Sequence, residues 1–310
     1  MTVTTKKSTD IYSLWQRISM WLDKENVMAG AFITPSLIIL ILFVAYPFVV
    51  AIYLSFTNRT IGGAGGYNFV GLKNYIYLLN DDIFLKTAVN TFNYTFVAVI
   101  FKLFLGMLMA LVLHEVKYFK NIFRGALLLP WVIPTSLSTL IWLWMFDSQY
   151  SVFNWILLSL GLIEKKIIWL GFPATAMMSV QIINIWRGIP FFGISLLAGL
   201  QTIPEEMYEA AEIDGANAWR RFWAITIPFL KPVTIVTTLF SIITTFADFQ
   251  IVYVLTKGGP VNSTHLFATL THNVAILAGQ LGRGAAVSLF IFPVLVIVVI
   301  IQLRSLQTDQ

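Results

Sequence analysis

Long apolar stretches separated by short polar segments dominate the chain. A helix of about 20 apolar residues crosses the hydrocarbon core of a bilayer, and six stretches reach that length. The pattern predicts transmembrane helices at about 31–56, 88–113, 125–146, 173–200, 232–255 and 284–303. We expect Pro130 and Pro134 to bend the third helix, and Asn184, Arg187 and Pro190 to interrupt the fourth.

The remaining segments are too short or too polar to span. Residues 1–30 form an N-terminal segment in which apolar residues recur at helical spacing over 11–22, which predicts an interfacial helix. We expect 152–163 to lie at the outer interface and 304–310 to form a short tail. Six spans place both termini on one side, and the basic residues of the loops favour the cytoplasm for that side.

Composition agrees with the apolar pattern. Hydrophobic residues make up 58% of the 310-residue chain, charged residues only 11%, and the mean hydropathy is +0.80. We therefore predict an all-α polytopic membrane protein, with residues 31–303 as its membrane domain. The net charge of +5 is spread over loops, which suits lipid headgroups and gives no nucleic-acid-binding pattern.

No catalytic or cofactor-binding motif stands out. Gly66 and Gly71 have the spacing of a P-loop, but Lys73 falls one residue too late and no Ser or Thr follows it. There is no cysteine, and the three histidines lack neighbours at metal-ligand spacing. We therefore expect no enzyme activity, no cofactor and no metal in this chain, and any process driven by ATP would need a separate ATPase.

One polar segment, Thr202–Pro228, separates the fourth and fifth predicted spans. Thr202 and Glu205 have the spacing of a capping box, and Gly215 is placed to end the helix that follows. The segment is thus predicted to contain two short helices with a break between them. By composition alone it could also be an amphipathic hairpin on the bilayer surface.

The spacing of this segment resembles the signature of permease subunits of binding-protein-dependent ABC importers. The matching residues are Glu209, Ala210, Ala211, Gly215, Ile225, Ile227 and Pro228, with Ile227 where leucine is usual. The resemblance implies the type I permease fold, in which 202–228 is a cytoplasmic coupling loop, and assigns the contact with the ATPase to Glu209, Ala210, Ala211 and Gly215. It also implies a prokaryotic inner (plasma) membrane, a second permease subunit, two ATPase subunits that bind ATP and Mg, and an extracytoplasmic solute-binding protein.

Polar groups inside the predicted spans are the candidates for a substrate pathway. Lys102, Arg187 and Asp248 need partners or water, because a charge at mid-bilayer is unfavourable. We expect Lys102 to serve packing, whereas Arg187 and Asp248 could either pair between helices or line a wet pathway. A sugar binds through hydrogen bonds to hydroxyls and through aromatic faces. The candidate pathway residues are Asn184, Arg187, Asp248, Gln250 and Trp142.

Three further motifs resemble the carbohydrate branch of the family, in its maltose-permease-like first subunit. They are 129–131 (LPW), 186–191 (WRGIPF) and 249–260 (FQIVYVLTKGGP). The resemblance implies uptake of a di- or oligosaccharide. A polyol or glycerophosphate importer, and an ion-coupled carrier built on Asp248 and Arg187, stay open as alternatives.

Overall fold

The computed structural model describes residues 25–63, 67–116 and 118–307, and these are almost entirely helical. In these ranges the only β pairing is an isolated antiparallel bridge between Thr57 and Phe69. The chain divides into two compact units, 1–53 and 54–310. The predicted interfacial helix at 11–22 lies outside the described residues, and so does Gly66.

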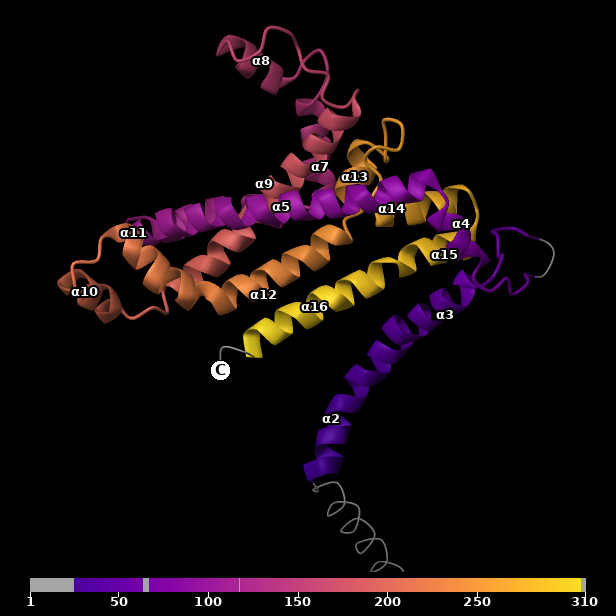
Figure 1. Cartoon of the computed structure of the whole chain (residues 1–310), viewed down its shortest axis with the longest axis horizontal. Coiled ribbons are helices and arrows are strands. Elements are labelled where there is room, and N and C mark those ends of the chain that lie inside the picture. Colours follow the sequence, from indigo (N-terminus) through magenta and orange to yellow (C-terminus); the bar gives the residue numbers. More distant parts are fainter. Residues whose placement is uncertain (1–24, 64–66, 117, 308–310) are drawn as a thin grey trace, which may run out of the picture. The chain divides into compact units, whose positions relative to one another are not determined.

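The first unit contains one long apolar helix. It comprises α2 (Glu25–Leu40), the π-helical turn η1 (Ile41–Ala45) and α3 (Tyr46–Ser55), which ends just inside the second unit (Figure 1). The stretch Met28–Ser55 is long and apolar enough to cross a membrane. This stretch corresponds to the first predicted span.

Three helices form the centre of the second unit. α5 (Asp82–Glu115) packs along α9 (Pro173–Leu200), and α12 (Ile227–Phe246) contacts both. α16 (Ile291–Gln307) packs along α12 (Figure 1). α5 begins earlier than the predicted residue 88 because the Asp81 carboxylate accepts a hydrogen bond from the Phe84 N–H at 2.9 Å and caps the helix.

Glycines allow α5 and α9 to approach closely. A Cβ at Gly106 of α5 would overlap the Cβ of Phe192, and a Cβ at Gly193 of α9 would lie 2.7 Å from the Met109 sulfur. Small residues serve the same purpose in membrane helix pairs generally, because dispersion rather than the hydrophobic effect holds the helices together.

Replacing Gly106 with valine is therefore expected to destabilise this helix pair. Overpacking of this kind costs about 1–3 kcal/mol of folding free energy. The control is Gly125→Val, at another helical glycine, which has no atom within 4 Å of its added Cβ. The measurement is the temperature at which the detergent-purified protein loses its monodisperse peak in size-exclusion chromatography. Equal temperatures for the two variants would contradict the expectation.

The third predicted span is two helices rather than one. α6 (Lys120–Val132) and α7 (Thr135–Met145) meet at 87°. Pro134 precedes α7, and Ile133 before it is extended, because the proline ring disfavours helical conformation in the preceding residue. The prediction of a bend is confirmed, but the prediction of one helix over 125–146 is wrong.

The interruption expected in the fourth span is absent. α9 is one continuous helix of 28 residues that includes Asn184, Arg187 and the buried Pro190. Helices α5, α6 and α12 pack along it. Neighbouring helices can thus support the turn whose hydrogen bond the proline removes.

The fifth predicted span is also divided. α12 ends at Phe246 and α13 (Gln250–Leu255) begins after a break of three residues, Ala247–Phe249. Asp248 therefore lies between two helices, and not within one helix over 232–255 as predicted. The sixth span consists of α15 (Leu281–Leu289) and α16, with Phe290 between them.

The described residues contain five helical stretches long and apolar enough to cross a membrane, or six if α6 and α7 together count as one. The other elements are short: α4 (Lys73–Leu79), α8 (Val152–Ser159), α10 (Glu205–Ile213), α11 (Ala218–Arg221), η2 (Phe222–Thr226), α14 (Phe267–His272) and η3 (Asn273–Leu277). α8 lies within 152–163, the segment expected to be too short to span the membrane. The all-helical membrane fold class is confirmed.

Candidate functional site

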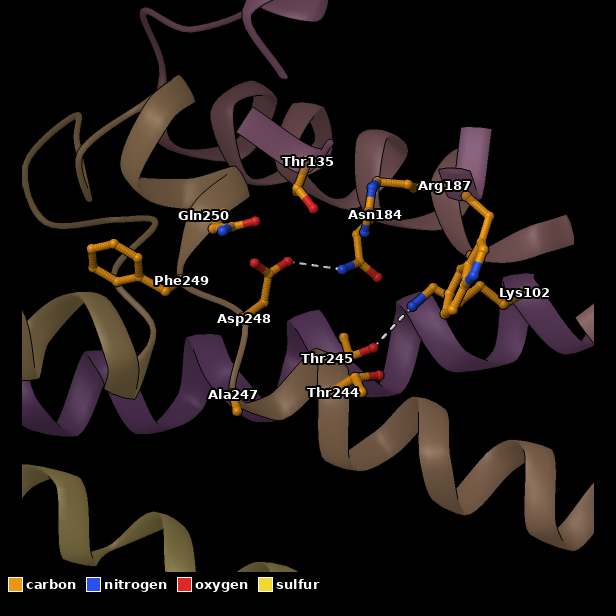
Figure 2. Close-up of a pocket in the computed structure, with 12 residues that line it drawn as sticks. Lys102, Thr135, Asn184, Arg187, Thr244, Thr245, Ala247, Asp248, Phe249 and Gln250 are labelled. Carbon is orange, nitrogen blue, oxygen red and sulfur yellow. Dashed lines mark hydrogen bonds between the residues drawn. The ribbon is translucent and has the colours of Figure 1, made fainter. Parts of the chain in front are cut away.

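The break between α12 and α13 brings three helices together around Asp248. One carboxylate oxygen of Asp248 accepts hydrogen bonds from the Tyr94 hydroxyl at 2.7 Å and from the Asn184 amide at 2.9 Å. Figure 2 shows the bond with Asn184. The other oxygen accepts a long bond of 3.4 Å from the Ile251 N–H, at the start of α13. Tyr94 belongs to α5 and Asn184 to α9, so the carboxylate links both helices to the break.

Lys102 extends from α5 into the same region. It is buried, and its ammonium donates a hydrogen bond of 2.9 Å to the Thr245 hydroxyl near the end of α12 (Figure 2). Its aliphatic stem crosses α9 at Gly188, where an added Cβ would lie 2.5 Å from the lysine Cε. The glycine therefore makes room for the lysine between the two helices.

These groups line a cavity of about 320 Å³, which is within the usual size range of small-molecule sites. Its walls come from α5, α6, α7, α9, α12, the break and the start of α13, through Lys102, Trp131, Thr135, Asn184, Arg187, Gly188, Thr244, Thr245, Ala247, Asp248, Phe249 and Gln250 (Figure 2). Within the described chain, Arg187 Nε and Asn184 Oδ1 are buried without a hydrogen-bond partner. The cavity lining thus combines charged, amide and hydroxyl side chains with two aromatic rings, those of Trp131 and Phe249.

The structure brings together four of the five predicted pathway residues. Asn184, Arg187, Asp248 and Gln250 all line the cavity. Trp142 does not line the cavity. The residue is 8% exposed, and its ring packs against those of Phe146, Phe153 and Trp186 at centroid distances of 5.4, 5.5 and 5.4 Å.

Sequence reasoning missed part of the lining. Lys102, which we expected to serve packing, both packs and lines the cavity. Thr135 also lines it, at the first position of α7. Pro134 could have indicated this position, because a helix usually ends before a proline and the helix that starts after it can run in a different direction.

The polar segment between α9 and α12 contains the two predicted short helices, α10 and α11. The predicted capping box is wrong: the Thr202 hydroxyl donates to the Gly199 carbonyl at 2.8 Å, and α10 starts after Pro204 without a side-chain cap. Asn217 instead caps α11, by accepting from the Arg220 N–H at 2.9 Å.

Gly215 ends α10 as predicted. Its φ of +75° lies in the left-handed region that favours glycine. The Gly215 N–H donates to the Glu212 carbonyl at 2.9 Å, and the Ala216 N–H to the Ala211 carbonyl at 2.8 Å. This pair of bonds is the Schellman motif, which fixes how the chain leaves the helix.

One face of α10 is attached to the membrane helices and another face is free. Tyr208 and Ala211 pack against a hydrophobic cluster that includes Leu200 and Ile225, and the Tyr208 hydroxyl lies 2.9 Å from that of Thr226. Glu209 and Ala210 are exposed, and so are the apolar side chains of Met207, Ile213 and Trp219. An ion pair between Arg221 and Glu212 connects α11 to α10.

A polar cavity among apolar helices, together with two short helices in a polar segment, is the arrangement expected of a transport permease. The chain matches the family described as binding-protein-dependent transport system inner membrane component over residues 102–307, and it belongs to that family. It is therefore a multi-pass membrane protein of the ABC importer permease class.

Curated relatives match along nearly the whole chain. The sulfoquinovosyl glycerol transport system permease protein SmoG of Agrobacterium fabrum is 36% identical over 94% of this chain and 94% of its own length. The trehalose/maltose transport system permease protein MalF of Thermococcus litoralis is 36% identical over 91% of this chain and 94% of its own length.

Solved structures share the fold. A chain of a bacterial ABC transporter involved in the import of the acidic polysaccharide alginate superimposes with a TM-score of 0.77 and 20% identity. The match covers 94% of this chain and 98% of that one. The ABC importer permease fold is therefore confirmed.

Proposed function

We propose that this chain is a permease subunit of an ATP-driven ABC importer that takes up a sugar, in the size range of a di- or oligosaccharide. The cavity at the Asp248 break is the observation that carries the proposal. It supplies amide, hydroxyl and carboxylate groups for sugar hydroxyls, and the rings of Trp131 and Phe249 for the apolar face of a sugar. The two relatives described above are permeases for sulfoquinovosyl glycerol and for trehalose and maltose by their names. These names support a sugar over a polyol or a glycerophosphate.

The importer requires other subunits. A second permease completes the pathway, two ATPase subunits bind ATP and Mg and hydrolyse the nucleotide, and an extracytoplasmic binding protein delivers the sugar. The fold supports this assembly, since another solved chain with a TM-score of 0.77 and 19% identity comes from an alginate transporter in complex with a periplasmic protein. In the inner (plasma) membrane the chain has six spans, with both termini and the 202–228 coupling loop in the cytoplasm.

The coupling segment transmits movement of the ATPase to the membrane helices. Its free face, with Glu209 and Ala210, docks on the ATPase, while Ala211 and Tyr208 hold the segment to α9 and to the start of α12. A short helix with fixed ends transmits a displacement better than a flexible loop. Displacement of α10 therefore moves α9 and α12, which contribute five of the twelve residues of the cavity wall, and switches the cavity between its inward- and outward-facing states.

The described contacts disfavour the ion-coupled carrier. That alternative needs Asp248 and Arg187 as an ion pair, whereas Asp248 bonds to Tyr94 and Asn184. Within the described residues, Asp248 and Arg187 do not form an ion pair.

Uptake into proteoliposomes tests the proposal. The complete importer is reconstituted with its binding protein, and uptake of labelled maltose, trehalose and sulfoquinovosyl glycerol is measured with and without ATP on the ATPase side. We expect at least one of these sugars to enter only with ATP, at a rate that ionophores leave unchanged. Uptake that persists without ATP and stops with an ionophore, or no uptake of any sugar tested, would overturn the proposal.

A further inference from the structure

The charges in the cavity are unbalanced. Two cationic side chains, Lys102 and Arg187, and one carboxylate, Asp248, line it. An arginine remains protonated in proteins, so with a protonated Lys102 the lining carries a net positive charge. Within residues 25–63, 67–116 and 118–307, neither Lys102 nor Arg187 forms an ion pair with Asp248.

The carboxylate is already engaged by uncharged donors. Asp248 accepts hydrogen bonds from Tyr94 and Asn184, and its other oxygen faces the Ile251 N–H. Lys102 donates to a hydroxyl, and Arg187 Nε is buried without a partner in the described chain. A purely structural arrangement would be expected to place one of the two cations on the carboxylate, because leaving a buried charge such as that of Lys102 uncompensated is strongly unfavourable.

The two cations lie at one end of the cavity, and Phe249 and Gln250 at the other (Figure 2). Gly188 allows the Lys102 stem to pass α9, so that its ammonium reaches the region beside Arg187 (Figure 2). A ligand of sugar size could therefore place one end between the cations and its ring against the aromatic and amide end.

Resting on the proposed function, we propose that the imported sugar carries a negatively charged group, a carboxylate, sulfonate or phosphate, which Lys102 and Arg187 bind together. The arginine fork suits an anion with two or three oxygens, and charge-assisted hydrogen bonds are shorter and stronger than neutral ones. The bound anion supplies the counter-charge that the protein leaves out, so the cavity selects acidic sugars over neutral sugars of the same shape.

The test is direct binding to the purified complete importer, with the binding protein omitted so that its selectivity does not enter. The probes share one ring and differ only at C6: glucose, glucuronate, sulfoquinovose and glucose 6-phosphate. We expect at least one acidic probe to bind about 10- to 100-fold more tightly than glucose, the equivalent of one hydrogen bond to a charged group. Comparing the affinities of the three acidic probes shows whether the cavity prefers a carboxylate, a sulfonate or a phosphate.

Variants at Lys102 assign this preference to the cavity. Lys102→Met keeps the aliphatic stem and removes the charge, and is expected to lower the ratio of acidic to neutral affinity about tenfold. Lys102→Arg restores the charge and most of the ratio. Lys73→Gln, at an exposed lysine at the start of α4 outside the cavity lining, leaves both affinities unchanged.

Three outcomes overturn the inference: equal affinity for glucose and the acidic probes, an unchanged ratio in Lys102→Met, or no binding of any probe. If ATP-driven uptake of a neutral sugar is nevertheless seen in proteoliposomes, the proposed function stands and only the acidic selectivity fails. If neither neutral nor acidic sugars are taken up with ATP, both fail.

Discussion

Replacing Gly215 with valine is expected to reduce ATP-driven uptake to less than a tenth of the wild-type rate while the protein still inserts into the membrane. The glycine has a φ of +75°, and nothing lies within 4 Å of an added Cβ, so the effect arises from backbone strain and not from a clash. A non-glycine residue in this region costs about 1–3 kcal/mol, and a β-branched residue is the least tolerated. The strain is relieved by breaking the Schellman bonds to Glu212 and Ala211, which changes the direction of α11 relative to α10.

The measurements are sugar uptake by the reconstituted importer and co-purification of the ATPase subunits. The control is Gly215→Asn, because asparagine tolerates the left-handed conformation and should retain most of the activity. Wild-type transport by a Gly215→Val variant that co-purifies with its ATPase would refute the assignment of this segment to coupling.

Asp248→Ala is expected to lower uptake at least tenfold and to leave assembly of the complex intact. The change leaves the Tyr94 hydroxyl and the Asn184 amide without their acceptor, and both side chains are buried. Each unsatisfied group costs about 1–3 kcal/mol unless it finds a new partner. The groups that contact a sugar are then reoriented, and the cavity loses its only carboxylate.

The control for this variant is Asp147→Ala, at an aspartate just after α7. The N–H groups of Tyr150 and Gln149 donate to the Asp147 carboxylate and hold its pKa below the ordinary value, so this aspartate serves a local turn. Uptake and the size-exclusion profile of the complex are measured for both variants. Unchanged uptake in Asp248→Ala would assign Asp248 to helix packing and remove it from the pathway.

The comparison of Asp248 with Trp142 shows where reasoning from the sequence succeeded and where it did not. A carboxylate within an apolar stretch must find polar partners, so Asp248 could be singled out without a structure. A tryptophan carries no such requirement. Whether Trp142 faces a cavity or an aromatic cluster depends on the direction of α7, and that direction is set by the 87° bend at Pro134.

The ends and breaks of helices likewise include some that local sequence predicts and others that depend on packing. Gly215 is predictable because its effect is local: glycine adopts a positive φ without penalty wherever the chain must turn. The absence of a break at Pro190 is not local, since it depends on the helices packed around α9. The failure of Thr202 as a cap has a local alternative, because its hydroxyl donates instead to the Gly199 carbonyl.

The sequence by itself determined that the chain is a helical membrane protein, where most of its spans lie, and which segment resembles a coupling loop. Long apolar runs and the Glu209–Gly215 spacing are patterns along the chain, and they can be recognised without knowing which residues are in contact. Only the tertiary structure decided that Lys102, Arg187 and Asp248 line one cavity and that the carboxylate pairs with neutral donors instead of the cations. Those facts depend on how α5, α9 and the break after α12 meet, and contacts between residues so far apart in the chain arise from packing and not from spacing.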